Sequence, residues 1–405
     1  MVNTTQRFIE ENFDKFVREC KEGSGTLIGL PFPFSIPSEN HFEELYYWDT
    51  YFTNLGLIVS GRLEQAKNNT DDMLYIVDKY GFMPNASRTT FLNRSQPPFL
   101  SLMVWDIYEK TNDIEWLKKA YEVLKKEHAF WNDKRSSPIG LSAYRGFASE
   151  DEAQYLAERY FERTGLRPDM EKRKIGEHMR LSYESGWDNN PRWDCRGFDF
   201  VHVDLNSILY IAEKTMSEIA IILENGEEEI WLNRANKRKD LMRKYLKTEK
   251  GYFTDYDYKN DCFSSVFSAA SFYPLFAGLA GEEEAAATVL MLHRLEQKFG
   301  ISACEKSDIE GNFQWNYPNG WAPHQYLVYR SLKNYGYEEE AQRIAKKYIT
   351  LVEKVFEETG NLWEKYNVRD GDIEVNTESP MPAMMGWSAG VYLALKSEIG
   401  DSFSE

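Results

Sequence analysis

The sequence predicts an all-α protein, an (α/α)6 barrel in which six helical hairpins form a ring. Apolar residues recur at helical spacing through most of the chain, in segments joined by short turns. Twelve such segments can be counted, which is the number that six hairpins need. We expect helices over residues 4–21, 49–60, 62–80, 96–111, 113–132, 205–224, 226–247, 264–280, 281–298, 322–335, 337–358 and 386–398.

The individual segments show both the apolar stripe and the breaks that end a helix. The stripe that opens the chain consists of Phe8, Ile9, Phe13, Phe16, Val17 and Cys20. A later stripe consists of Met73, Leu74, Ile76, Val77 and Tyr80. Gly61 precedes this later segment and Gly81 follows it, while Gly281 and Gly336 separate further pairs. Short turns between consecutive segments favour hairpins whose two helices lie side by side.

Two stretches interrupt the hairpins and are the places to search for chemistry. Residues 133–204 are rich in Gly, Pro, Asp, Arg and Trp, and residues 299–321 are rich in aromatic residues and Asn. A long irregular segment within a compact domain usually carries function. No Ser/Gly linker and no shift in composition divides the chain, so we expect a single domain over residues 1–405.

The charge of the chain excludes several classes of partner. The formal net charge of −17 repels phosphate backbones and anionic lipid headgroups, and no basic stripe offsets it. We therefore expect neither a nucleic-acid nor a membrane partner. Aromatic residues reach 15% of the chain, with 11 Trp and 25 Tyr, which suits flat rings that stack on sugar faces as well as aromatic anchors of a core.

The cysteines and the N-terminus predict the compartment. Cys20, Cys195, Cys262 and Cys304 lie far apart with no CxxC spacing, so neither a metal site nor a disulfide framework is indicated. The chain opens without an apolar signal core and contains no run of 18 apolar residues. We expect a cytoplasmic protein without metal or cofactor, and we take a monomer as the working expectation.

A carboxylate between two tryptophans is the first candidate for chemistry. Asp188 follows Trp187 and precedes Trp193 in a stretch without amphipathic periodicity. Apolar walls raise the pKa of a carboxyl, as a general acid requires at neutral pH. The alternative is a structural turn in which both tryptophans fill the core. Two further aromatic stretches, 46–52 and 314–323, offer stacking rings and amide donors for hydroxyl groups, or simple core anchors.

Five motifs carry a resemblance to a known family and appear in that family's order. They are Phe42 to Phe52, Arg94 to Phe99, Glu184 to Asp188, Val203 to Ser207 and Gln314 to Pro323. Together they resemble the trehalase family of glycoside hydrolases from about Pro31 to Leu395. The resemblance implies an (α/α)6 barrel with an active site at one mouth, and an enzyme of carbohydrate metabolism that hydrolyses an α-linked glucoside, α,α-trehalose above all.

The resemblance also implies roles for individual residues. Asp188 matches the general acid, and Glu378, which precedes Gly386-Trp387 at the family's distance, matches the general base; Glu374 is the competing base. Net inversion implies that the two carboxyl groups lie about 6.5–9.5 Å apart, with a water between them. The sugar-binding positions fall on Phe42, Trp48, Asp49, Asn85, Arg94, Gln96, Trp315 and Trp321.

Three departures from the family pattern affect the leaving-group side. His41 stands where the family has an Arg, residues 372–377 replace a Gly-rich run, and Arg145, Glu150 and the segment 167–169 are ambiguous substitutes for an Arg-Pro-Glu segment. An alternative substrate is therefore another α-glucoside or an α-mannoside, such as glucosylglycerate or mannosylglycerate. Arg88 or Arg145 could then hold the anionic leaving group.

Two functions of other classes also fit this barrel, because fold alone does not fix function. A sugar epimerase would need a pair of basic residues at the mouth, usually histidines, and the six histidines show no paired spacing. A non-catalytic sugar-binding protein would follow if Asp188 and Glu378 lay far apart or faced different mouths.

Overall fold

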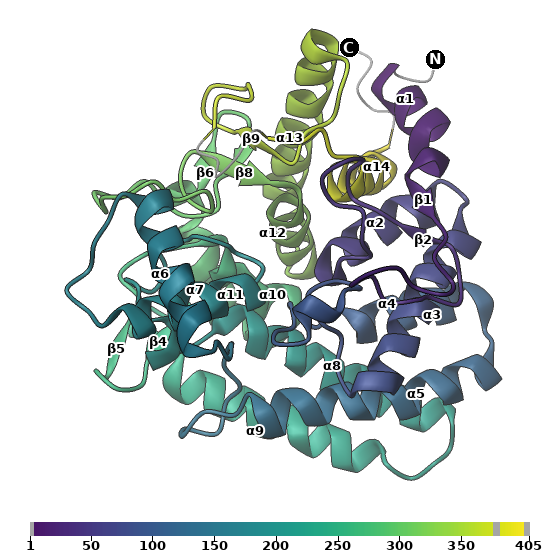
Figure 1. Ribbon diagram of the computed structural model, residues 1–405, viewed down its shortest axis with the longest axis horizontal. Coiled ribbons are helices and arrows are strands. Elements are labelled where there is room, and N and C mark those ends of the chain that lie inside the picture. Colours follow the sequence, from purple (N-terminus) through teal and green to yellow (C-terminus); the bar gives the residue numbers. More distant parts are fainter. Residues whose placement is uncertain (1–3, 376–380, 401–405) are drawn as a thin grey trace.

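A computed structural model describes residues 4–375 and 381–400, which fold into a largely helical structure with a few short strands (Figure 1). The helices are α1 (Thr4–Asn12), α2 (Tyr47–Val59), α3 (Leu63–Tyr80), α4 (Leu100–Thr111), α5 (Ile114–Ala129), α6 (Glu150–Thr164), α7 (Lys172–Glu184), α8 (Val203–Ile222), α9 (Glu228–Tyr245), α10 (Tyr273–Phe276), α11 (Glu282–Leu290), α12 (Ala322–Asn334), α13 (Glu338–Thr359) and α14 (Gly386–Ile399). The strands are β1 (Val17–Arg18), β2 (Phe34–Ser35), β3 (Phe200–Val201), β4 (Tyr256–Asp257), β5 (Cys262–Phe263), β6 (Glu296–Gln297), β7 (Gly300–Ile301), β8 (Asn319–Trp321) and β9 (Lys365–Asn367).

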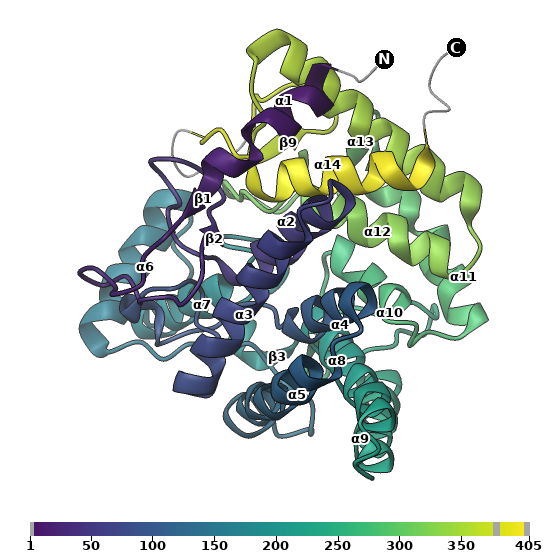
Figure 2. The ribbon, with the colours of Figure 1, turned by 90° about the vertical axis from the view of Figure 1, so that its right-hand side faces the viewer.

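Six helices form a closed inner ring, which confirms the predicted (α/α)6 barrel. In chain order these are α2, α4, α8, α10, α12 and α14, and each packs against the next. The ring closes because α14 packs against α2, as Figure 2 shows. Outside the ring, α3, α5, α9 and α13 each pack against one or two inner helices, and α1 packs against α13.

Four of the inner helices, α2, α4, α12 and α14, point in one direction. The first turns of α2 and α14 and the residues that precede α4 and α12 line one pocket, at what we name the near mouth. A separate pocket is lined by the second halves of α2, α4 and α14 together with Tyr326 of α12. The N-termini of these four helices therefore gather at the near mouth. Loops that precede inner helices carry the side chains that the near mouth can use.

The closure of the ring depends on two glycines. A Cβ on Gly56 of α2 would lie 2.5 Å from the Cα of Gly390 on α14, and a Cβ on Gly390 would lie 2.0 Å from the carbonyl oxygen of Phe52. No side chain fits between backbones at these distances. Both positions therefore require glycine for the first and last inner helices to meet.

The structure corrects the expected elements in four places. The expected helix over 281–298 ends at Leu290 and continues as a 3-10 turn and β6. Helices α6 and α7 form a hairpin inside the stretch 133–204, which we expected to be irregular. Ser149 caps α6 by accepting a hydrogen bond from the backbone N–H of Glu152, and Gly165 ends it in the left-handed conformation. The expected helix over 264–280 shortens to a 3-10 turn and the four residues of α10. The expected helix over 4–21 ends at Asn12 and continues as a 3-10 turn and β1.

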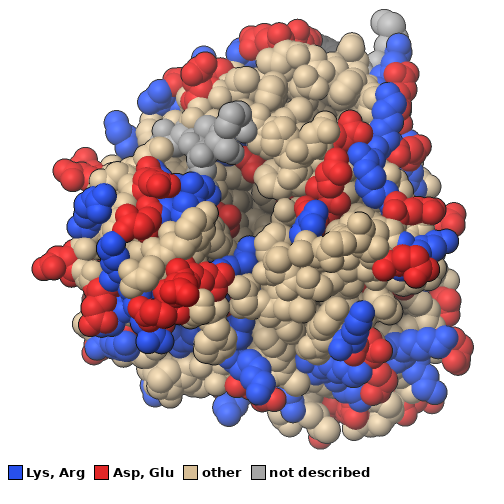
Figure 3. All heavy atoms as spheres, viewed as in Figure 1, with Lys and Arg blue, Asp and Glu red and all other residues tan. Residues whose placement is uncertain are grey.

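Surface charges are mixed over the face seen in Figure 3, which is hollowed near its centre. Acidic and basic side chains lie interspersed on that face and form no large patch of one sign. Within residues 4–375 and 381–400, no helix combines the length and the apolar character that crossing a bilayer requires.

Candidate active site

The pocket at the near mouth brings together most of the residues that the sequence singled out. It has a volume of about 90 Å³ and is lined by Phe42, Tyr46, Trp48, Asp49, Gln96, Gly186, Asp188, Gln314, Trp315, Trp321, Glu364, Met384 and Trp387. Seven of these were predicted as site residues: Phe42, Trp48, Asp49, Gln96, Asp188, Trp315 and Trp321. They come from separate segments of the chain, so the ring itself assembles the pocket.

Stacked tryptophans form one wall of this pocket. Trp315 and Trp321 lie face to face, with ring centroids 3.7 Å apart and an angle of 1° between the planes. Trp48 contacts Trp315 at a centroid distance of 5.6 Å, Trp387 contacts Trp321 at 5.7 Å, and Trp187 stacks on Trp315 at 5.5 Å. Such a wall offers apolar faces to a sugar ring, while the carboxyl and amide groups of the pocket can bind its hydroxyls.

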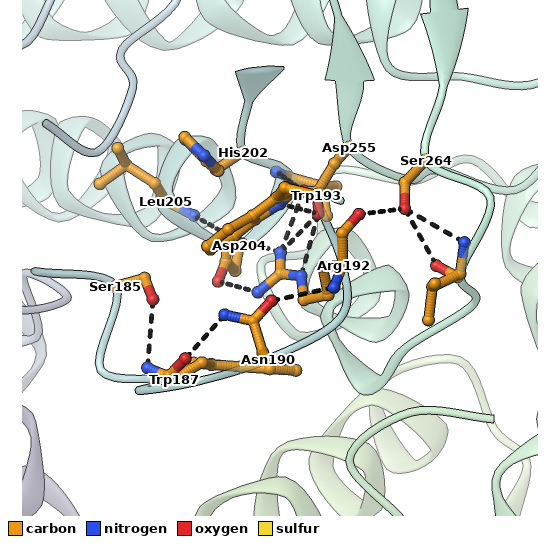
Figure 4. Close-up of polar contacts among 12 residues, drawn as sticks. Ser185, Trp187, Asn190, Arg192, Trp193, His202, Asp204, Leu205, Asp255 and Ser264 are labelled. Atoms are coloured by element: carbon orange, nitrogen blue, oxygen red, sulfur yellow. Dashed lines mark hydrogen bonds and ion pairs between the residues drawn. The ribbon is translucent and has the colours of Figure 1, made fainter. Parts of the chain in front are cut away.

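The segment that carries Asp188 is held on both sides of the carboxylate. Gly186 adopts a left-handed φ of 73°, and a Cβ there would lie 2.8 Å from the Trp48 ring. The carbonyl of Trp187 accepts hydrogen bonds from Ser182 Oγ at 3.0 Å and from Asn190 Nδ2 at 2.7 Å. Figure 4 shows the second of these bonds beside the bond from the Trp187 N–H to Ser185 Oγ. The backbone beside Asp188 therefore has little freedom to move.

A buried ion-pair network anchors the end of this segment (Figure 4). Arg192, whose side chain is fully buried, pairs with Asp204 at 3.1 Å and with Asp255 at 2.9 Å. Asp255 also accepts hydrogen bonds from Trp193 Nε1 and from the backbone N–H of Val203, the first residue of α8. The network thus ties the segment after Asp188 to an inner helix and to the residues before β4.

We expect Arg192→Met to lower the free energy of unfolding by about 3–5 kcal/mol, because Asp204 and Asp255 would stay buried without a counter-charge. Urea denaturation followed by circular dichroism measures this change. Arg330→Met is the matched control, since the side chains of its ion pair with Glu398 are 34% and 36% exposed and the pair should contribute about 1 kcal/mol or less. Equal losses in both variants would contradict the role of the buried network.

Asp49 is a second carboxyl group in the pocket, on the first turn of α2. Only 6% of the residue is exposed, and burial raises its pKa to about 8, with smaller contributions from the negative charges of Glu364 and Asp188. At neutral pH Asp49 therefore keeps its proton. A neutral carboxyl can donate one hydrogen bond and accept others, which suits the recognition of a sugar hydroxyl.

Glu364 is a pocket carboxylate that the sequence reasoning missed. It directly precedes β9, its side chain is 15% exposed, and it forms an ion pair with Lys365 at 2.5 Å. A weak signal was present, since Trp363-Glu364-Lys365-Tyr366 places a carboxylate among aromatic residues directly after the turn that ends α13. Asp188, Asp49 and Glu364 thus supply three carboxyl groups to one pocket.

Of the two residues predicted as the base, the structure describes Glu374 and not Glu378. Glu378 lies outside the described residues, so its expected distance from Asp188 stays a prediction. Glu374 is exposed and is not among the residues that line the pocket. Its backbone N–H donates to Asp372 Oδ1 at 2.9 Å, and its carbonyl accepts from Asn367 Nδ2 at 3.0 Å.

Two other predicted residues lie beside the pocket rather than on its lining. The guanidinium of Arg94 stacks on Phe91 and Tyr183, with centroid distances of 4.4 Å and 5.4 Å. Burial lowers the pKa of Arg94, and the negative charge of Asp188 acts in the opposite direction. Asn85 donates to the carbonyl of Tyr183 at 3.4 Å. Arg94 thus lies close enough to act electrostatically on Asp188.

The departures from the family pattern do not place new cations on the lining of the pocket. His41 is exposed and is not a lining residue. Arg88 pairs with Glu44, and Arg145 donates to the carbonyl of Phe198 at 2.6 Å. Glu184 is bound by the guanidinium of Arg135. Neither Arg88 nor Arg145, the two arginines that we expected could hold an anionic leaving group, thus lines the pocket.

The described parts of the chain show no group of side chains suited to a metal ion. Over residues 4–375 and 381–400, no three His, Cys, Asp or Glu side chains are grouped closely enough to hold a metal ion. The pocket that these residues form offers carboxyl groups, amides and aromatic rings for chemistry.

Comparison with known proteins identifies the family. A family model described as trehalase matches residues 6–400. The chain belongs to the trehalase family. Among solved structures, this trehalase-family chain is similar to a neutral trehalase of Saccharomyces cerevisiae, with 26% sequence identity and a TM-score of 0.79 over 98% of this chain and 80% of that one.

A second similar structure shares the fold alone. It is a GH63 mannosylglycerate hydrolase of Thermus thermophilus in complex with glucose, with 17% identity and a TM-score of 0.67 over 96% of this chain and 99% of that one. Membership of the trehalase family makes the protein a glycoside hydrolase that acts on α-linked sugars. It also favours hydrolysis over the epimerase and sugar-binding alternatives.

Proposed function

We propose that this trehalase-family enzyme hydrolyses α,α-trehalose to glucose with inversion, using Asp188 as general acid and Glu364 as general base. The observation that carries the proposal is that both carboxylates line one pocket with a wall of stacked tryptophans. Hydrolysis of a glycosidic bond requires such a pair, one carboxyl to give a proton and one to take it. Family membership and the yeast relative, a neutral trehalase, support the choice of substrate.

The proposed reaction proceeds in one displacement. Glu364 takes a proton from a water molecule while the water oxygen attacks the anomeric carbon. The bond from that carbon to the bridging oxygen breaks, and Asp188 gives its proton to this oxygen, so that the second glucose leaves as a neutral alcohol. Each carboxyl group then exchanges its proton with solvent to return to its starting state.

The other pocket groups support the reaction by binding and shielding the sugar. Asp49 enters as a neutral hydrogen-bond donor, since its pKa of about 8 keeps the proton in place at neutral pH. The stacked pair Trp315 and Trp321 covers one face of the ring. Gln96, whose side-chain oxygen accepts from the backbone N–H of Trp48 at 3.4 Å, steadies the first turn of α2. These contacts hold the anomeric carbon between acid and base.

Glu364 is preferred to Glu374 as the base because it lines the pocket with Asp188. Glu374 is exposed, and the pocket lining does not include it. Glu378 remains the rival that mutagenesis has to separate from Glu364.

We also place the reaction in the cytoplasm, which fits four cysteines that form no disulfide.

The anomer released from α,α-trehalose tests the function and its stereochemistry together. Inversion should give one β-glucose and one α-glucose from each trehalose, because only the attacked carbon changes configuration. Proton NMR during the first minutes of reaction, before mutarotation, should show equal signals of the two anomers. An initial product that is entirely α-glucose would establish retention, and no release of glucose would refute trehalose as the substrate.

A second candidate substrate class is the α-glycosides of glycerate. His41 is exposed and stands at a position where the family has an Arg. This exchange changes the hydrogen-bond donors on the leaving-group side, which is the reason to test these glycosides. Glucosylglycerate and mannosylglycerate should be compared with trehalose by kcat/KM in the same assay. Arg94, whose charge interacts with that of Asp188, is the cation that could attract their carboxylate.

A further inference from the structure

Lys365 is a fully buried lysine next to the proposed base. Its side chain has no exposed surface, and its Nζ lies 2.5 Å from Glu364 Oε2. Lysine is rarely buried completely, because an ammonium ion loses its hydration and requires a partner in return. Glu364, whose side chain is 15% exposed, is the carboxylate that provides this partner. The ion pair therefore has one buried member and one member that reaches the pocket.

The surrounding elements hold the ammonium group and the carboxylate in place. Lys365 pairs with Trp321 in the register of β8 and β9, and its Nζ lies 4.7 Å from the centroid of the Trp321 ring. The carbonyl of Glu364 accepts a hydrogen bond from Trp387 Nε1 at 2.9 Å. The carbonyl of Trp363 accepts one from Ser388 Oγ at 2.6 Å. The segment at Glu364 is thus fixed by β8 on one side and by α14 on the other.

Two carboxyl groups and one ammonium group surround Glu364. Asp49 faces it from α2, Asp188 from the segment after α7, and Lys365 from β9, while β8 and α14 contribute tryptophans. Two of these three neighbours are carboxyl groups, and like charges at close range favour protonation of one another. An inverting reaction needs an ionised base beside a protonated acid. The buried ammonium of Lys365 is the positive charge that lies directly against the Glu364 carboxylate.

We propose that Lys365 is a positioning residue of the reaction, whose buried ammonium holds the Glu364 carboxylate in an ion pair and orients it toward the attacking water. This inference rests on the proposed role of Glu364 as the base. Lys365 itself touches neither the sugar nor the water. It acts through one carboxylate, so its loss should change the pH dependence of kcat/KM more than it changes the binding of the sugar.

The experiment compares Lys365→Met, Lys365→Gln and Lys365→Arg by the pH profile of kcat/KM on α-glucosyl fluoride. Fluoride leaves without a proton from the acid, so the acidic limb of this profile reports the base. The Met and Gln variants remove the positive charge that lies 2.5 Å from Glu364 Oε2, and the reaction requires this carboxylate to accept a proton from water. We therefore expect the acidic limb to move to higher pH by ~1–3 units in the Met and Gln variants, and to stay in place in the Arg variant.

Lys347→Met serves as the matched control, because Lys347 pairs with Glu296 at 2.6 Å and lies on α13 outside the pocket lining. Its profile should keep the parental acidic limb. An unmoved limb in either folded neutral variant would show that Lys365 is only structural, whatever the melting temperature does. A displaced limb in the Arg variant, which keeps the charge, would overturn the proposal equally. If Lys365→Met and Lys365→Gln both fail to fold, Lys365→Arg remains as the test, because a displaced acidic limb in that variant contradicts the proposal.

Glu364→Gln separates a failure of this inference from a failure of the proposed function. If Glu364→Gln keeps near-parental turnover, Glu364 is not the base and the proposed function itself is wrong at that residue. If Glu364→Gln is inactive while the limb of the Lys365 variants does not move, the base assignment stands and only the inference about Lys365 falls.

Discussion

Glu364→Gln should lower kcat on α,α-trehalose by about 10²–10⁴-fold, because the amide keeps the shape of the carboxylate but cannot take a proton from water. KM should change far less than kcat, since the amide can still form hydrogen bonds in the pocket. Initial rates give both constants, and a thermal melt by circular dichroism shows whether the variant is folded.

The matched controls for this variant are Glu374→Gln and Glu378→Gln. Glu374 is exposed and outside the pocket lining, so its variant should keep turnover close to that of the parent. A loss in Glu378→Gln that equals the loss in Glu364→Gln would reopen the choice of base. Sodium azide decides between them, because a small anionic nucleophile replaces the activated water. Only the variant that lacks the base should recover activity and release β-glucosyl azide.

Asp188→Asn should lower kcat on α,α-trehalose by a similar factor of about 10²–10⁴, because the leaving glucose then departs without a proton. The loss should be much smaller on α-glucosyl fluoride, since fluoride is a weak base that leaves as the anion. The ratio of the two losses is the measurement, and it identifies Asp188 as the acid.

The control for Asp188 is Glu364→Gln on the same two substrates. Without the base, both substrates should lose activity to a similar extent, because both need an activated water. Equal losses for Asp188→Asn on trehalose and on the fluoride would argue against its role as a proton donor. Stable folding of Asp188→Asn is expected, since the buried network of Arg192, Asp204 and Asp255 remains intact.

The helical framework could be predicted because its signal is local. The segments 205–224, 337–358 and 386–398 correspond closely to α8, α13 and α14, whose apolar stripes are buried. The hairpin of α6 and α7 was not predicted, because the Gly, Pro, Asp and Arg content of residues 133–204 is typical of loops. The sequence of α6 carries a Ser cap, a Gly stop and a stripe that includes Leu156 and Tyr160, which together would have predicted it.

The site was predictable where contiguous motifs carried it. Trp48 and Asp49, Asp188, and Trp315 with Trp321 belong to long motifs, and all of these residues line the pocket. Glu364 was not predicted as a site residue, because no local pattern distinguishes it among 65 acidic residues. Its place in the pocket depends on the pairing of β8 with β9, between segments about 45 residues apart, and on the burial of Lys365. The expected single domain and monomer stay predictions.

The contact of α2 with α14 through Gly56 and Gly390 has a consequence for how the chain folds during synthesis. The last inner helix, α14, leaves the ribosome more than 300 residues after α2. Until then, the face of α2 that packs on α14 stays uncovered. Trp387, which lines the pocket, lies on that last helix. The catalytic pocket is therefore complete only when the ring has closed, so that enzymatic activity reports the final step of folding, and a chain cut short before α14 would expose an apolar seam to chaperones and proteases.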